Sequence, residues 1–158
     1  MSRPEVLVSD LREEPLLPEA TLERVRLATA TTLEAEGLPD AQLSVTLVDD
    51  ARMASLHLRY LQQAGPTDVL AFPLADEDDS DPLLGEVIVS VDTANREARD
   101  RGLAPEEELL RYVIHGTLHL LGYDDQEAGE RERMLQRQES LLTAFLSRTA
   151  DPSGQREP

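Results

Sequence analysis

Apolar and polar residues along this chain follow two periods, and the longer period marks its helices. Apolar residues that recur every three or four positions line one face of a helix. Gly37 and Gly102 stand where two of these segments end, and glycine is a common helix stop because it adopts the left-handed conformation. The predicted helices span residues 18–36, 51–62, 92–101, 105–121 and 126–146.

The shorter period predicts strands. Between residues 41 and 48, Leu43, Val45 and Leu47 alternate with polar residues, which is typical of a half-buried strand. Pro73 lacks a backbone donor and restricts its segment to a sheet edge or a strand end. The predicted strands span residues 6–9, 41–48, 67–73 and 85–91.

Three of the predicted helices have features that predict where they lie or where they begin. The helix 105–121 is apolar on nearly every side from residue 109 onward, so we expect it to be buried at the centre of the domain, with its histidines facing a cleft. Asp92 is expected to cap the helix that ends at Arg101. The last helix places mixed charges opposite a side formed by Met134, Leu135, Gln138, Leu141, Leu142 and Phe145, so it should pack outside the central helix.

The segment from His115 to Asp125 holds two of the three histidines in the chain. His115 and His119 are four residues apart, a spacing that puts both imidazoles on one helix face. Gly122 can end the helix and turn the chain back, so that Asp124 and Asp125 are offered to the same ion. Two histidines, a carboxylate and an open water position are a common layout for catalytic zinc.

Two other interpretations of the histidine pair remain open. The residues also resemble the H-x-x-x-H-x-x-G-x-x-H helix of metzincin proteases, but Gly116 stands where those enzymes carry a general-base glutamate and Asp125 stands in the third ligand position. Alternatively, His115 and His119 face the buried side of a packed helix, are satisfied by backbone carbonyls and bind no metal.

The composition of the chain limits the number of domains, the types of metal ligand and the localisation that we expect. The chain has 158 residues, which suits one domain over residues 1–147 followed by a disordered polar tail over 148–158. It contains no cysteine, so metal ligands must be histidine or carboxylate. Residues 1–10 do not resemble a secretory signal, and no stretch approaches the roughly 18 apolar residues of a membrane span. We therefore expect a cytoplasmic protein without a membrane partner.

The net charge of −17 repels nucleic acid at long range, so a nucleic-acid partner must meet a local patch. All fifteen basic residues are arginine. We interpret this as genomic compositional bias, although the guanidinium fork also suits phosphate oxygens.

Three segments, 67–73, 85–90 and 115–125, resemble in order and spacing the signature segments of the YbeY family. The resemblance covers about residues 40–145, and its third segment is the most specific. It implies a compact α+β domain in which a mostly parallel sheet of about four strands is surrounded by helices, with the metal-binding helix central. Members are described as bacterial metal-dependent endoribonucleases of ribosomal RNA maturation and ribosome quality control.

The resemblance also implies a ligand set. The family holds one zinc ion with three histidines, of which two carry over as His115 and His119 while the third falls on Asp125. Carboxylate oxygen also ligates zinc, but it makes the site harder and lowers its charge by one. Such a site favours hard metal ions more than a three-histidine site does.

A second departure concerns an arginine that follows a tyrosine in the second helix of the family. Here Tyr60 is followed by Leu61, and Arg59 stands one residue earlier, about 100° round the helix. His57 replaces a usual asparagine nearby. Arg59 is nevertheless the candidate for this catalytic role.

The chemistry expected from the resemblance is cleavage of single-stranded RNA by a zinc-activated water, with His115, Asp124 and Arg59 as catalytic residues. Asp68 and Glu108 are further candidates for proton transfer. The expected partner is ribosomal RNA, within the ribosome or together with ribosomal proteins, and DNA is not expected. The alternatives are a ribosome assembly factor with a structural metal and a zinc peptidase.

Overall fold

The computed structural model describes residues 3–13, 16–61, 69–73, 83–123 and 127–149, and for residues 57–61 it describes the backbone alone. The strands are β1 (Glu5–Asp10), β2 (Gln42–Val48), β3 (Val69–Pro73) and β4 (Leu83–Ser90). The helices are α1 (Glu19–Ala35), α2 (Asp50–Leu61), α3 (Val91–Arg101), α4 (Pro105–Leu120) and α5 (Ala128–Thr149).

The strands form one 4-stranded sheet in the order β1-β2-β4-β3. β1, β2 and β4 run parallel, and β3 pairs with β4 in the antiparallel direction. A row of register partners, Val8, Val45, Val87 and Ala71, crosses all the strands. The α+β architecture with a mostly parallel sheet is confirmed, and β3, which ends at Pro73, is an edge strand as expected.

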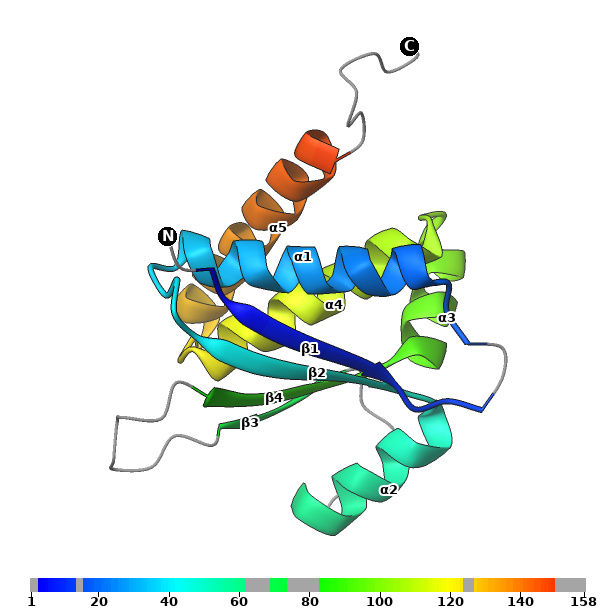
Figure 1. The fold of residues 1–158 in the computed structure, drawn as a ribbon. Coiled ribbons are helices and arrows are strands. Elements are labelled where there is room, and N and C mark those ends of the chain that lie inside the picture. Colours follow the sequence, from blue (N-terminus) through cyan, green and yellow to red (C-terminus); the bar gives the residue numbers. More distant parts are fainter. Residues whose placement is uncertain (1–2, 14–15, 62–68, 74–82, 124–126, 150–158) are drawn as a thin grey trace.

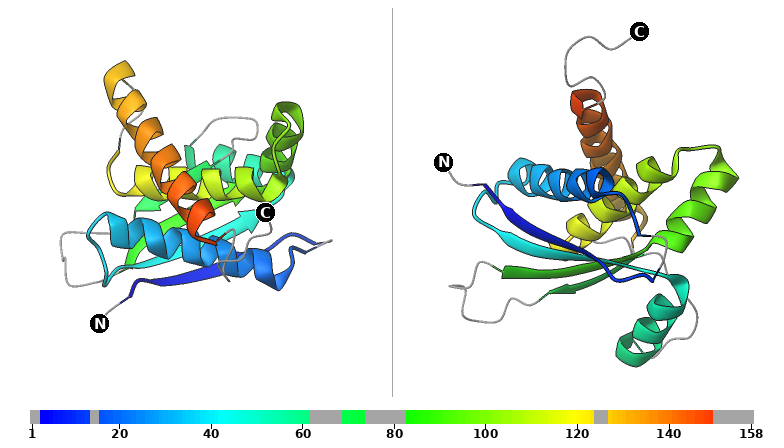
Figure 2. Two further views of the ribbon diagram at one scale, coloured as in Figure 1. Left: turned by 90° about the horizontal axis from the view of Figure 1, so that it is seen from above. Right: turned by 45° about the vertical axis from the view of Figure 1, so that its right-hand side comes forward.

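The helices cover the two faces of the sheet unequally. Helices α1 and α4 lie on one face, and α2 lies on the other (Figure 1). α5 crosses α4 and α1 on the side away from the sheet, as the view from above shows (Figure 2). α4 is therefore enclosed by α1, α3, α5 and two strands, which makes it the central helix of the domain.

The main core lies between the sheet and α1, α4 and α5. Its largest fully buried side chains include Leu33, Leu43, Leu110, Ile114 and Met134. A second cluster lies between the opposite face of the sheet and α2, and it consists of Val48, Met53, Leu70 and Ile88. No helix in the described ranges is long and apolar enough to cross a membrane.

Three local details differ from the sequence prediction. The cap of α3 is Ser90, whose hydroxyl accepts from Thr93 N at 3.2 Å, because the helix begins at Val91, and Asp92 instead accepts from Asp50 N at 2.9 Å. The alternation expected in β2 gives way to burial on both faces from Val45 to Val48, since α2 covers the second face there. α5 continues to Thr149, beyond the expected end at residue 146.

Candidate metal centre

α4 carries both candidate ligands. It begins at Pro105, whose missing N–H costs nothing at the first helical position, and its first turn holds Glu106, Glu107 and Glu108, which suit the positive end of the helix dipole. At the other end, Gly122 has φ 107°, a left-handed conformation that suits glycine. The predicted glycine turn after the histidines is therefore present.

The imidazoles of His115 and His119 lie side by side on one face of α4. Their ring centroids are 6.4 Å apart and the ring planes differ by 14°. His115 is half-buried and His119 is exposed. The helix is central as expected, but its histidine face lies at an open edge of the domain and not deep within it.

His119 is held by the turn that follows α4. Its Nδ1 lies 3.1 Å from the backbone oxygen of Tyr123. A carbonyl oxygen can only accept, so Nδ1 carries the proton and Nε2 keeps its lone pair.

The turn itself is anchored to two other helices. The Tyr123 hydroxyl donates to Glu36 at 2.8 Å, and Arg137 Nε donates to the same carboxylate at 2.7 Å. The hydrogen bond to Glu36 raises the pKa of Tyr123, and burial adds to the effect. The carbonyl that orients His119 is therefore fixed by contacts with α1 and α5.

His115 is held by α5. Its Nδ1 lies 2.7 Å from Gln138 Oε1, and Gln138 Nε2 donates to Glu139 Oε2 at 2.9 Å. Because the carboxylate can only accept, the amide oxygen of Gln138 is the end that faces the ring. His115 is therefore also protonated on Nδ1, with its Nε2 lone pair available.

This pair fits a metal ion in the chemistry of its donors. Neutral imidazole nitrogen is a preferred zinc ligand, and a ligating histidine usually donates its other N–H to a carbonyl, amide or carboxylate oxygen. Both conditions are met at His115 and His119. Within the described ranges, no third histidine or carboxylate completes a metal-binding group with them. The predicted third ligand, Asp125, and the predicted catalytic Asp124 lie outside those ranges.

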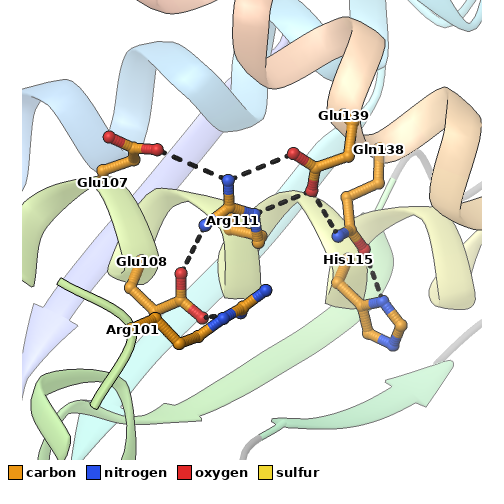
Figure 3. Close-up of polar contacts among 7 residues, drawn as sticks. All are labelled: Arg101, Glu107, Glu108, Arg111, His115, Gln138 and Glu139. Atoms are coloured by element: carbon orange, nitrogen blue, oxygen red, sulfur yellow. Dashed lines mark hydrogen bonds and ion pairs between the residues drawn. The ribbon is translucent and has the colours of Figure 1, made fainter. Parts of the chain in front are cut away.

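An ion-pair network continues from Gln138 along α4 (Figure 3). Arg111 holds Glu139 through Nε at 2.7 Å and Nη2 at 3.1 Å, contacts Glu107 at 3.4 Å and pairs with Glu108. These carboxylates raise the pKa of Arg111, that of Glu139 most of all, and Arg111 in turn lowers the pKa of Glu139. Both groups are therefore charged at neutral pH.

Glu108 has a structural part in this network. Its side chain is 0% exposed and accepts from Arg101 Nη1 at 3.0 Å as well as from Arg111. Both of its oxygens are thus occupied by guanidinium groups. The structure therefore gives Glu108 a role in packing, and proton transfer by this residue stays a prediction.

A groove of about 750 Å³ runs beside His115, between α3, α4 and α5. His115 and Gln138 line it together with Arg96, Arg101 and Arg111. Three arginines are matched by three glutamates along its wall, so its formal charge is balanced in a strongly acidic protein.

The other predicted catalytic residue is Arg59. It belongs to α2, on the opposite face of the sheet from α4 (Figure 1), and its side chain is outside the described part of the chain, as is that of His57. Asp68 also lies outside the described residues.

Sequence reasoning missed Gln138, Glu139 and Arg111. One signal for Gln138 was available, because it is a polar residue on the otherwise apolar side of the last helix. Such an amide must find hydrogen-bond partners when it is buried, and Gln138 is 5% exposed. Its partner across 23 positions of sequence was not visible from periodicity.

Comparison with known proteins identifies the family of this chain. Residues 10–146 match the family model described as Endoribonuclease YbeY. The Endoribonuclease YbeY of Aquifex aeolicus is 41% identical over 116 residues, covering 73% of this chain and 77% of that protein. The Endoribonuclease YbeY of Desulforamulus reducens is 37% identical over 144 residues, covering 87% of this chain and 94% of its own length.

The fold has a counterpart among solved structures. The solution structure of TM1509 from Thermotoga maritima superposes with a TM-score of 0.67 and 27% sequence identity, and the match covers 96% of each chain. The family match runs from the end of β1 through most of α5 and includes both histidines. The chain therefore belongs to the endoribonuclease YbeY family.

Proposed function

We propose that this protein is a zinc-dependent endoribonuclease that cleaves single-stranded RNA, with one zinc ion held by His115, His119 and Asp125. The observation that carries the proposal is the shared state of the two imidazoles. Both donate Nδ1–H to an oxygen, and both keep Nε2 for a ligand. Family membership supports the reaction, since the relatives are named endoribonucleases.

The chain's own residues would prepare this chemistry by orientation. Gln138 and the Tyr123 carbonyl hold the two rings in a fixed tautomer, so no rearrangement is needed when a ligand arrives. When bound, zinc supplies a Lewis acid that lowers the pKa of water and polarises a phosphoryl oxygen. Asp124 is the proposed proton carrier, and Arg59 is proposed to face the phosphate.

The groove beside His115 is the proposed path for RNA. A net charge of −17 repels a polyanion from most of the surface, so the strand must follow a place where charge is balanced. Arg96 and Arg101 have side chains that are 48% and 54% exposed along this groove. Their guanidinium groups can turn toward phosphate oxygens, which they bind in a bidentate manner.

Ribosomal RNA is the proposed substrate, in rRNA maturation and ribosome quality control. The resemblance to the family motifs supports this choice. The acidic surface also suits contact with basic ribosomal proteins, which would bring the groove to RNA that the protein alone would repel.

The test measures zinc content and cleavage of structured ribosomal RNA in the same preparations. The wild type should hold about one zinc ion per chain and cut the RNA, and His115→Ala and His119→Ala should lose both properties. His57→Ala, at the histidine outside α4, is the matched control and should keep both. Cleavage that persists after complete metal removal would overturn the mechanism, and an intact zinc site without cleavage would favour an assembly factor.

A peptidase is not supported by the position that would carry its base. The nearest atoms to a Cβ built on Gly116 belong to Val87 and Val69 of the sheet, so a side chain there would not face the histidine edge. Casein in the same assay should remain uncut.

A further inference from the structure

Gln138 is a buried amide whose two ends are both in use. Its side chain is 5% exposed on the side of α5 that packs on α4. Oε1 contacts His115 Nδ1 at 2.7 Å, and Nε2 donates to Glu139 at 2.9 Å. A glutamine can present either its oxygen or its NH₂ to a ring nitrogen, and the two choices impose opposite tautomers on the histidine.

Glu139 fixes which end of the Gln138 amide faces His115. Its carboxylate has no proton to donate, so it can only accept from Gln138, and this turns the amide oxygen toward His115. Arg111 holds that carboxylate in place with two hydrogen bonds, at 2.7 and 3.1 Å. Arg111 is itself fixed by Glu108, which is fully buried. The chain of contacts from α4 to α5 and back is drawn in Figure 3.

We propose that Gln138 and Glu139 are positioning residues that fix His115 as the Nδ1–H tautomer and so reserve its Nε2 for a metal ion. This inference rests on the proposed metal site for its purpose, although the tautomer itself exists with or without metal. Neither residue would touch the ion. Residues that orient a metal-binding histidine in this way typically contribute about 10–100-fold to metal affinity.

Removing Glu139 releases the amide. With Glu139→Ala, nothing favours the orientation that faces Oε1 toward the ring, so part of the population turns its NH₂ to Nδ1. In that population Nδ1 must hold the lone pair, and the proton moves to Nε2, the nitrogen that a metal needs. Zinc affinity should fall by about 10-fold or more.

The direct measurement is the tautomer of His115 in metal-free protein, read from its ring nitrogen shifts in long-range proton–nitrogen NMR spectra. These are recorded at a pH at which the ring is neutral, and a chelator competition assay gives the zinc affinity of the same samples. Wild type should show Nδ1–H, and Glu139→Ala should show a rise in Nε2–H.

Glu107→Ala is the matched control, because Glu107 is another carboxylate on Arg111, whereas the hydrogen bonds described for Gln138 join it to His115 and Glu139. It should keep the wild-type tautomer and affinity. The double variant Gln138→Glu with Glu139→Ala should restore Nδ1–H, since a carboxylate at position 138 can only accept. If Glu139→Ala does not fold, Gln138→Met removes the acceptor directly and should raise the Nε2–H fraction.

A wild-type spectrum with Nε2–H, or an unchanged tautomer in both Glu139→Ala and Gln138→Met, would overturn the inference. Its failure is separable from that of the proposed function. A shifted tautomer in Glu139→Ala together with full zinc binding by His115→Ala would retain the positioning role and refute the metal site. Zinc binding that depends on His115 but is unchanged in the Glu139 and Gln138 variants would retain the metal site and refute the positioning role.

Discussion

Gly116 of α4 lies directly against Val87 of β4. A Cβ at position 116 would come within 2.5 Å of Val87 Cγ1 and 2.6 Å of Val69 Cγ1, closer than packed carbon atoms approach. The glycine therefore lets the central helix rest on the sheet at the turn that carries His115. The absence of a glutamate beside the first histidine is thus a consequence of packing, because the position faces the sheet.

Gly116→Ala should accordingly destabilise the protein. Overpacking a core costs about 1–3 kcal/mol, which exceeds the gain of up to about 1 kcal/mol from replacing glycine with alanine in a helix. The free energy of unfolding is measured from urea transitions. Gly129→Ala in α5 is the control, since its Cβ would meet only the Arg133 side chain at 4.0 Å. Equal stability of the two variants would contradict this account of the α4–sheet contact.

Glu108→Gln tests the structural role of the buried carboxylate. Loss of its charge weakens the hydrogen bonds to Arg101 and Arg111, and since Arg101 is 54% exposed and Arg111 keeps Glu139, the cost is that of a charged hydrogen bond, about 1.5–3 kcal/mol. We expect a loss near the lower limit, because glutamine keeps one acceptor oxygen. Thermal and urea unfolding give the value.

The control for this variant is Glu107→Gln. Glu107 is 30% exposed and touches the same arginine at 3.4 Å, so its loss should change stability by less than about 1 kcal/mol. The pH profile of RNA cleavage separates packing from proton transfer. A profile altered in shape by Glu108→Gln, at temperatures where the variant is folded, would support proton transfer by Glu108.

Much of this fold was predictable because local rules and tertiary packing agree. The helix stops at Gly37 and Gly102 have φ of 82° and 68°, as left-handed glycines should. The spacing of His115 and His119 predicted that both imidazoles lie on one face of α4, where their ring centroids are 6.4 Å apart. Pro73 ended an edge strand for the reason expected, the missing backbone donor.

The remaining features depend on contacts between distant segments. Ser90 caps α3 although it reads as the last residue of a strand, because the chain turns from β4 into the helix without a linker. Gln138 reaches His115 only because α5 folds back over α4. Periodicity reports which face of a helix is buried, but not which polar group meets it there.

Asp50 should make stability depend on pH in the acid range. It begins α2 and accepts hydrogen bonds from Ser90 Oγ at 2.7 Å, Thr93 Oγ1 at 2.9 Å and the Arg96 guanidinium. Burial raises the pKa of Asp50, but these hydrogen bonds and the charge of Arg96 outweigh it, so the pKa lies below the usual 3.8. A carboxylate with a lowered pKa stabilises the fold above its unfolded pKa, and this stabilisation disappears as the pH falls through the folded pKa.

Asp50→Asn should therefore be less stable than wild type near pH 7, by about 1–2 kcal/mol, and the difference should shrink as the pH falls below about 4. Urea midpoints measured from pH 7 down to pH 3 give both quantities. Asp100→Asn replaces an exposed carboxylate on α3 and serves as the control. A difference between Asp50→Asn and wild type that stays constant over this range would contradict the linkage.

Asp125 is the proposed ligand that departs from the three-histidine set of the family resemblance, and three substitutions examine it. Asp125→Ala should lower zinc affinity while leaving His115 and His119 in place, because a site with two protein ligands holds zinc weakly. Asp125→His should raise the affinity above that of the wild type, since it recreates the three-histidine set that the family resemblance implies and offers zinc a softer donor. Asp124→Ala is the neighbouring control and should keep the zinc while cleavage falls by about 10²–10⁴-fold. Zinc content that is insensitive to Asp125→Ala but lost in Asp124→Ala would assign the third ligand to Asp124 and remove that residue from proton transfer.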